Sequence, residues 1–343
     1  MPTFSNSLAY LIWIFRKLQK AQKPPSSRAQ ARVLGRRQYP MTILASPADD
    51  LMQVVLPSVR DLGDGFQVRR ALPSAQRRSV GPFIFFDSFG PVAFRAGDGL
   101  DTRPHPHIGL ATLTYLIQGE ILHRDSEGYV QAIRPGEVNL MTAGRGIVHS
   151  ERTAPAARAA GGTVFGFQSW LALPVVQEET DPGFQHVAAT DLPQLDGDDA
   201  TLRLIAGSLH GQRAPTRSFS DLFNAELVLR GGARFQVTAE HVERAVYVVE
   251  GAISIEGQEG TFGKDRLVVF KPDAEIVLRA VGATRLMLLG GEPLPEKRHI
   301  FWNFVSSRRE RVEQAARDWQ DGRFPIVPGD LEFIPLPAGR RTA

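Results

Sequence analysis

Short apolar runs, separated by glycine, proline and aspartate, make up most of the chain after residue 54. Many of these runs combine β-branched and aromatic residues, a composition typical of strands. The gaps between the runs are too short to hold helices, so the pattern predicts an all-β protein built as a sandwich or a barrel. In the first half of the chain the runs cover residues 66–68, 83–86, 111–117, 120–123 and 164–171.

A second group of such runs covers residues 225–290 and shares a phrase with the first. A tyrosine, a glycine four positions later and an isoleucine two positions after that occur in both groups, 132 positions apart: Tyr115, Gly119 and Ile121, then Tyr247, Gly251 and Ile253. The repeat predicts one β-barrel unit used twice, with each glycine providing a turn of positive φ between two strands. The runs of the second group are 225–229, 234–237, 245–249, 252–256, 266–270, 275–280 and 285–289.

This repeat divides the chain into parts. We expect a first barrel over residues 54–190, a loop-rich connector over 191–220 and a second barrel over 221–337. The last part also contains a predicted helix, which begins with a capping box formed by Ser307 and Glu310 and ends near Gly322. An extended, proline-rich tail follows and is expected to pack across a barrel. The apolar stripe of the helix consists of Val312, Ala315, Ala316 and Trp319.

Basic charge is concentrated at the start of the chain. Residues 1–40 hold eight basic side chains and no acidic one, whereas the rest of the chain holds 32 basic and 37 acidic side chains. A mildly acidic body argues against nucleic-acid binding by the fold. The apolar run 8–15 is too short to span a bilayer. We expect residues 1–40 to be a disordered tail, either an unimportant extension ahead of a start at Met41 or, as the weaker alternative, an interfacial helix.

The chain contains no cysteine. Disulfides, thiolate metal sites and cysteine nucleophiles are therefore excluded together. This composition fits a reducing compartment, and we predict a cytoplasmic location.

Two short pairs carry the candidate chemistry: His105 with His107, and His149 with Glu151. Residues i and i+2 of a strand point to the same face, so each pair can direct two donor atoms at one point. Two such strands facing each other inside a barrel would surround one metal ion with three imidazoles and a carboxylate. About two octahedral positions would stay open for substrate and dioxygen.

The repeat also predicts which barrel holds the metal. The positions 132 residues after the four candidate ligands are Val237, Ala239, Val281 and Ala283, none of which can bind a metal. His241 lies close by, but one imidazole does not make a site. We therefore expect a metal site in the first barrel and none in the second.

Several longer strings resemble the pirin family, whose members are bicupins. The strings lie at residues 81–87, 103–109, 141–151, 302–307 and 323–329, and the resemblance runs from about residue 54 to residue 337. It implies two cupin (jelly-roll-type) β-barrels facing each other, with a C-terminal helix and an extended tail. It also implies one iron site in the N-terminal barrel, with His105, His107, His149 and Glu151 as the ligands.

The resemblance implies two functions, and the sequence does not separate them. One is a quercetin 2,3-dioxygenase (quercetinase) type of oxidoreductase that uses Fe(II) and O2 to cleave a flavonol-like aromatic substrate. The other is a non-catalytic, iron-binding redox sensor that binds a partner protein. Other divalent transition metals are expected to compete for the site in purified protein. We expect a monomer with no membrane span.

Two positions depart from the family's pattern, and several further residues are candidates for the site. Ala111 stands where many pirins have glutamate, and Leu140 where many have tryptophan, a change expected to reshape the pocket wall. Glu151 is either a ligand only or also a general base. His123 is expected at the surface or, as the weaker alternative, beside the metal ligands as a supporting residue. Asp101 and Arg103 are candidates either for orienting an imidazole or for ordinary pairing within their loop. Some of the phenylalanines at positions 83, 85, 86 and 89 are expected to line the pocket.

Overall fold

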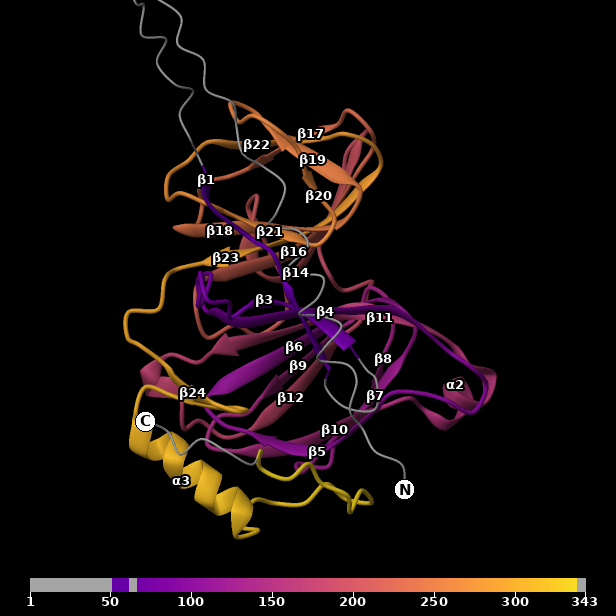
Figure 1. Cartoon of the computed structure of the whole chain (residues 1–343), viewed down its shortest axis with the longest axis vertical. Helices are drawn as coiled ribbons and strands as arrows, with labels where there is room; N and C mark the ends of the chain where they lie inside the picture. Colours follow the sequence, from indigo (N-terminus) through magenta and orange to yellow (C-terminus); the bar gives the residue numbers. More distant parts are fainter. Residues whose placement is uncertain (1–50, 62–66, 338–343) are drawn as a thin grey trace, which may run out of the picture. The chain divides into compact units, whose positions relative to one another are not determined.

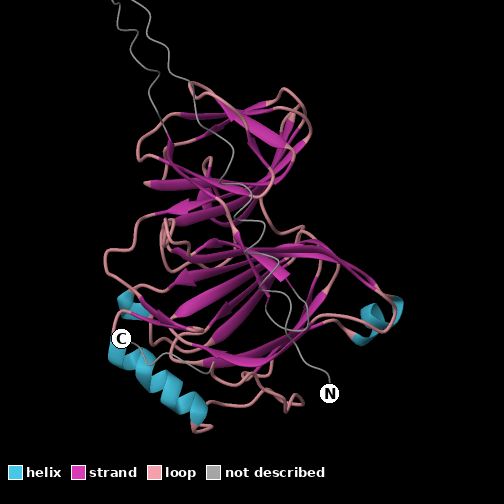
Figure 2. Ribbon diagram, in the orientation of Figure 1, coloured by secondary structure: helices cyan, strands magenta, loops and turns pink. Residues whose placement is uncertain are grey.

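Strands provide almost all of the regular structure in the computed structural model, which describes residues 51–61 and 67–337 (Figures 1 and 2). The predicted basic tail, residues 1–40, lies outside the described residues. The all-β prediction is confirmed, with four main antiparallel sheets arranged as two barrels. In the described ranges no helix is both long enough and apolar enough to cross a membrane.

The first barrel consists of a seven-stranded sheet in the order β12-β9-β6-β11-β4-β3-β2 and a four-stranded sheet in the order β5-β10-β7-β8. Helix α2 (Pro155–Ala160) joins β10 to β11, and a 3-10 turn (Val175–Gln177) follows β11. The strands are β2 (Ser58–Asp61), β3 (Gln67–Leu72), β4 (Phe83–Phe94), β5 (Asp101–His107), β6 (Leu110–Gln118), β7 (Ile121–Asp125), β8 (Val130–Ile133), β9 (Val138–Thr142), β10 (Ile147–Arg152), β11 (Gly162–Ala172) and β12 (Gly183–Val187).

The second barrel has one sheet in the order β1-β21-β18-β23-β16-β14-β13, with β15 paired to β14, and a four-stranded sheet in the order β17-β22-β19-β20. The strands are β1 (Leu51–Val55), β13 (Gln194–Asp196), β14 (Ala200–Leu209), β15 (Gln212–Arg213), β16 (Leu222–Leu229), β17 (Arg234–Val237), β18 (Glu243–Glu250), β19 (Ala252–Ile255), β20 (Phe262–Gly263), β21 (Arg266–Phe270), β22 (Ile276–Ala280) and β23 (Thr284–Gly291).

Two segments of the second barrel come from unexpected parts of the sequence. Strand β1, near the start of the described chain, pairs with β21 rather than with a strand of the first barrel. Strands β13 to β15 lie within residues 191–220, the stretch that we expected to be a loop-rich connector. We therefore propose that the boundary of the second barrel lies near residue 194 and that β1 completes it.

The two large sheets face each other across a shared apolar core. On β6, Ala111, Leu113 and Tyr115 point into this core, while the alternate residues point into the first barrel, as the two-residue period of a strand requires. Leu140 on β9 also lies in the shared core and is not among the pocket-lining residues. The expectation that Leu140 reshapes the pocket wall is therefore wrong, because its strand position turns the side chain toward the other barrel.

The interiors of the two barrels differ in chemistry. Aliphatic and aromatic side chains fill the second barrel, including Val246, Leu278 and Leu288, each of which is fully buried. The four-stranded sheet of the first barrel instead turns polar side chains inward, among them the buried residues His123 and His149. Burying a polar group costs free energy unless the group has a partner, so the polar side chains inside the first barrel require an explanation.

The predicted repeat is visible in the fold. Tyr115 and Tyr247 are both buried, at equivalent places on β6 and β18. Gly119 and Gly251, which follow them, have φ values of +88° and +76°. These left-handed conformations are costly for other residues, so glycine is required at both turns.

The predicted C-terminal helix is present as α3 (Arg309–Gln320), and Val312 and Ala315 are buried on its inner face. It packs on the hairpin of β24 (His299–Phe301) and β25 (Phe304–Ser306) at the lower left of Figure 1. The predicted capping box is wrong, because no side chain caps α3. The Ser307 hydroxyl donates instead to the buried carboxylate of Glu178, 129 residues earlier in the chain.

Candidate metal centre

Strands β5 and β10 bring the predicted histidines together as neighbours in one sheet. His149 pairs with His105, and His107 pairs with Ile147. We expected two strands facing each other across the barrel; they are adjacent and antiparallel instead. Adjacent strands serve equally well, because directly paired residues project on the same face, roughly 5 Å apart.

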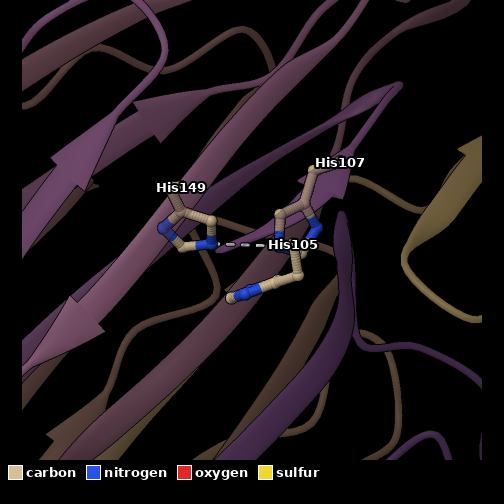
Figure 3. A group of neighbouring side chains, drawn as sticks. All are labelled: His105, His107 and His149. Atoms are coloured by element: carbon tan, nitrogen blue, oxygen red, sulfur yellow. Dashed lines mark hydrogen bonds between the residues drawn. The ribbon is translucent and has the colours of Figure 1, made fainter. Parts of the chain in front are cut away.

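The three imidazoles converge on one point, as Figure 3 shows. One ring nitrogen from each of His105, His107 and His149 lies within 4.8 Å of the other two. The dashed line in Figure 3 joins the Nε2 atoms of His107 and His149, which are 3.1 Å apart. All three side chains are buried. Two Nε2 atoms this close leave no room for a proton on each, so at least one lone pair faces the centre of the cluster.

Burial determines the charge of these rings. Removal from water lowers the pKa of His105 to about 4, and the carbonyl of Arg103 only partly opposes this effect. The pKa values of His107 and His149 are lowered well below the usual range, first by burial and then by the neighbouring imidazoles. The rings are therefore neutral at pH 7, which is the protonation state that binds a metal ion. The donor set fits a divalent transition metal.

A hydrogen bond fixes the orientation of His105. Its Nδ1 lies 2.8 Å from the carbonyl oxygen of Arg103, so Nδ1–H donates and the Nε2 lone pair is free. Arg103 therefore orients an imidazole through its backbone. Asp101 does not, because its carboxylate pairs with the guanidinium groups of Arg152 and Arg158.

His149 is held by His123, a histidine expected beside the ligands only as the weaker alternative. Its Nδ1 lies 3.4 Å from Nδ1 of His123, and Nε2 of His123 lies 2.9 Å from the carboxylate of Asp125. The prediction that His123 lies at the surface is wrong: the side chain is buried and stacks on Phe184. The spacing His123-x-Asp125 has the same two-residue period as the ligand pairs, and this was the only signal in the sequence.

Glu151 lies close to the histidines but is not part of the three-imidazole cluster. The pairing of β10 with β5 shifts after His149, so Glu151 pairs with Thr102 and not with Arg103. Its side chain is buried, and its Oε1 accepts a hydrogen bond from Nε2 of Gln168 at 3.3 Å. Burial raises the pKa of this carboxyl group. A cation nearby would favour the ionised form and oppose that shift.

A pocket of about 360 Å³ opens beside the cluster, and His105, His107 and Glu151 form part of its lining. Its wall contains Phe85 and Trp170, whose rings are stacked with centroids 4.1 Å apart and an interplanar angle of 11°. The remaining lining is mostly apolar: Val68, Pro73, Ile84, Phe89, Leu100, Ile121, Ile300, Trp302 and Ile334, with Arg70, Asp87, Thr102, Gln168 and Asn303 as the polar members. Pockets of this size and character bind small organic molecules.

Phe85, Phe86 and Phe89 divide between the two faces of β4 as strand alternation requires, whereas Phe83 does not, because the pairing of β4 with β11 shifts between Phe83 and Phe85. Phe85 and Phe89 line the pocket, whereas Phe83 and Phe86 lie in the core between the barrels. Ala111 lies in that same core, on the opposite face of β6 from the barrel interior. The departure from the cupin glutamate at this position therefore leaves the three histidines unchanged.

Fold and site together define a two-barrel cupin protein with a histidine cluster in the first barrel. Comparison with known proteins gives the family. The Pirin model matches residues 65–171, and the model of the pirin C-terminal cupin domain matches residues 224–325. The chain belongs to the pirin family.

Relatives support this assignment along most of the chain. A pirin-like protein of Caulobacter vibrioides is 46% identical over 282 residues, which cover 81% of this chain and 96% of that protein. Among solved structures, a quercetin 2,3-dioxygenase from Acinetobacter baumannii superposes with a TM-score of 0.79 at 32% identity, covering 86% of this chain and 98% of that one. A second quercetin 2,3-dioxygenase structure from the same organism has a TM-score of 0.75 at 28% identity.

Proposed function

We propose that this chain is a metal-dependent dioxygenase of the quercetin 2,3-dioxygenase type, with a flavonol-like aromatic substrate and O2. One observation carries the proposal: three buried, neutral imidazoles converge at the wall of an apolar pocket lined by stacked aromatic rings. The similarity to a quercetin 2,3-dioxygenase of A. baumannii supports the same reaction class.

The residues of the first barrel suit Fe(II), held by His105, His107 and His149 with Glu151 as the fourth ligand. Bound iron would supply the one-electron chemistry with dioxygen that an organic substrate in its ground state does not provide by itself. The chain contributes the protonation state of the ligands, because burial keeps the imidazoles neutral. The apolar lining excludes water from the site.

The lining of the pocket would determine how such a substrate lies. Phe85 and Trp170, whose rings are stacked on each other, give the pocket an apolar wall beside which a planar aromatic ring system would lie. The guanidinium carbon of Arg70 lies 4.1 Å from the centroid of the Phe85 ring, on which the guanidinium group is stacked, and Arg70 is held by a bidentate pair with Asp87. Glu151, which lines the same pocket, would accept the proton of the flavonol 3-hydroxyl group. Both oxygen atoms of O2 would enter the ester product of ring opening, and the ring carbon that bears the 3-hydroxyl group would leave as carbon monoxide.

The test is anaerobic reconstitution with Fe(II), followed by quercetin and oxygen. We expect loss of the flavonol absorbance and formation of carbon monoxide. His149→Ala should abolish both metal loading and turnover. The control is His186→Ala, which should preserve both, because His186 lies outside the cluster and is hydrogen-bonded to Asn139 on β9. Full iron occupancy without turnover of any flavonol would refute the enzymatic proposal and favour the iron-binding redox sensor.

Glu151→Gln separates the two roles of the carboxylate. If Glu151 acts as the base, the variant should keep its metal and lose about 10²–10⁴-fold in turnover. If it acts as a ligand, the dissociation constant of the metal should rise instead. Measuring the metal content and the turnover of the same sample distinguishes a base from a ligand.

A further inference from the structure

A second group of potential ligands lies at one end of the large sheet of the second barrel. Strand β16 begins and β23 ends at the paired residues Leu222 and Gly291, so the flanking residues Asp221 and Glu292 lie side by side. The backbone N–H of Glu292 donates to the carbonyl oxygen of Asp221 at 3.0 Å. His241 comes two residues before β18, whose first residue also pairs with Gly291. The sheet register therefore brings the three side chains together.

His241 is the buried member of this group, and its ring is held in one orientation. Its Nε2 lies 2.8 Å from the carbonyl oxygen of Ser208, so Nε2–H donates there. The ring stacks on Phe223, with centroids 5.0 Å apart. Its Nδ1 is buried and has no hydrogen-bond partner, and it points toward Asp221, whose Oδ1 is 3.8 Å away. That distance is too long for a hydrogen bond.

This arrangement is the one found in histidine metal ligands. A ligating imidazole usually donates its other N–H to a carbonyl or carboxylate oxygen, which fixes the lone pair on the ligating nitrogen. In His241 the carbonyl of Ser208 has that role. One ligand atom from each of Asp221, His241 and Glu292 lies within 4.8 Å of the others. A buried lone pair facing two carboxylates is unfavourable unless a positive charge lies between them.

We propose that Asp221, His241 and Glu292 bind a divalent transition cation such as Zn(II). One imidazole and two carboxylates favour a first-row transition metal over Mg²⁺ or Ca²⁺, which prefer ligand sets made of oxygen alone. Asp221 and Glu292 are exposed, so an ion can enter from solvent and keep water in its remaining positions. The site would tie together the ends of β16 and β23 and the segment before β18.

The proposal departs from our expectation that the second barrel holds no metal. That expectation concerned the positions equivalent to the first-barrel ligands, and the repeat gives no information about the end of the sheet where these residues lie. The proposal does not depend on the proposed dioxygenase function, because none of its three residues lines the pocket beside His105 and His107.

The competing explanation is that a proton, and not a metal ion, lies between the imidazole and the carboxylates. The charged ring of His241 would then form an ion pair with them. Metal stoichiometry decides between the two. The experiment uses the full chain carrying His149→Ala, which disables the first site, stripped with a chelator and then equilibrated with Zn(II). We expect one bound equivalent per chain by elemental analysis after dialysis, and none when His241→Gln is added. Co(II) in place of Zn(II) would add a visible absorption band that reports the same site.

The controls keep the test falsifiable even if His241→Gln disturbs folding. Asp221→Asn and Glu292→Gln change exposed side chains, and each should raise the dissociation constant by about tenfold or more. His210→Gln, which changes another imidazole of the second barrel, should leave Zn(II) binding unchanged. Absence of a bound equivalent in the His149→Ala chain would overturn the proposal, as would unchanged Zn(II) binding in the Asp221→Asn and Glu292→Gln variants.

Discussion

At the scale of single residues, Asp125 decides which nitrogen of His149 is available to a cation. Its Oδ1 accepts the backbone N–H groups of Glu127 and Tyr129, both at 3.0 Å, which leaves Oδ2 for Nε2–H of His123. His123 can then accept from Nδ1–H of His149, and the Nε2 lone pair of His149 faces the other histidines. Three side chains thus act in series to set one tautomer.

This chain of contacts predicts a strong effect of Asp125→Asn. The two backbone donors require the amide oxygen at the Oδ1 position, so the amide NH2 faces His123 and reverses every donor and acceptor up to His149. We expect the dissociation constant of the bound metal to rise about 10–100-fold with little loss of stability. Competition with a chelator of known affinity measures this change.

The matched control is Asp196→Asn, the same chemical change at an exposed carboxylate on β13. It should leave the metal affinity unchanged. Equal affinities for the Asp125→Asn variant and the unmodified chain would show that the tautomer of His149 is set by another group.

At the scale of elements, the segment after α3 runs beside β5 of the first barrel and reaches the pocket. The N–H of Ile334 donates to the carbonyl of Pro104 at 2.8 Å, and the indole N–H of Trp319 donates to the carbonyl of Ile334 at 3.0 Å. Arg152, next to Glu151, forms a bidentate pair with Asp330 at 2.7 and 2.8 Å. Ile334 is also a pocket-lining residue, so this segment couples the end of the chain to the pocket.

Asp330→Asn tests this coupling. Loss of the charge-assisted pair with Arg152 should cost about 1–2 kcal/mol and should loosen residues 325–337. We expect faster hydrogen exchange in that segment and a higher KM for the aromatic substrate, with the metal content unchanged. Asp321→Asn is the control, because its partner Arg323 is half exposed at the end of α3. Unchanged exchange in the Asp330→Asn variant would show that backbone contacts alone hold the segment.

At the scale of the whole described molecule, the two barrels share one core. Phe86 on β4 contacts Phe167 in its own barrel and Tyr247 in the other, with ring centroids 5.6 and 5.3 Å apart. The hydroxyl of Tyr115 donates to the carboxylate of Glu226, again from one barrel to the other. Sheets joined by a buried apolar layer are expected to unfold together.

Phe86→Ala should therefore destabilise both barrels at once. The expected loss is about 3–5 kcal/mol, because a large buried ring is removed from a close-packed layer. Urea unfolding followed by tryptophan fluorescence and by far-ultraviolet circular dichroism should give superimposable transitions, both shifted to lower urea. Phe333→Ala, at a ring that is 58% exposed, should shift them by a small fraction of that amount. Two separate transitions would contradict a common core.

The amino-acid sequence by itself determined the features that depend on local order. Strand periodicity gave the all-β class, the offset repeat gave two barrels, and the spacing of His105, His107 and His149 gave the histidine cluster, because residues two apart on a strand must share a face. The family resemblance added the same architecture from longer strings. Each of these inferences uses the spacing of residues along the chain and needs no knowledge of which strands pair.

The tertiary structure decided everything that depends on pairing between distant segments. Strand pairing placed His123 and Asp125 beside His149, drew β1 into the second barrel and turned Ser307 toward Glu178 instead of toward its own helix. Register also collected Asp221, His241 and Glu292 at one end of a sheet. A strand's period fixes which face a side chain takes, but only the register between strands fixes what it meets there, and that register is set by the packing of the whole molecule.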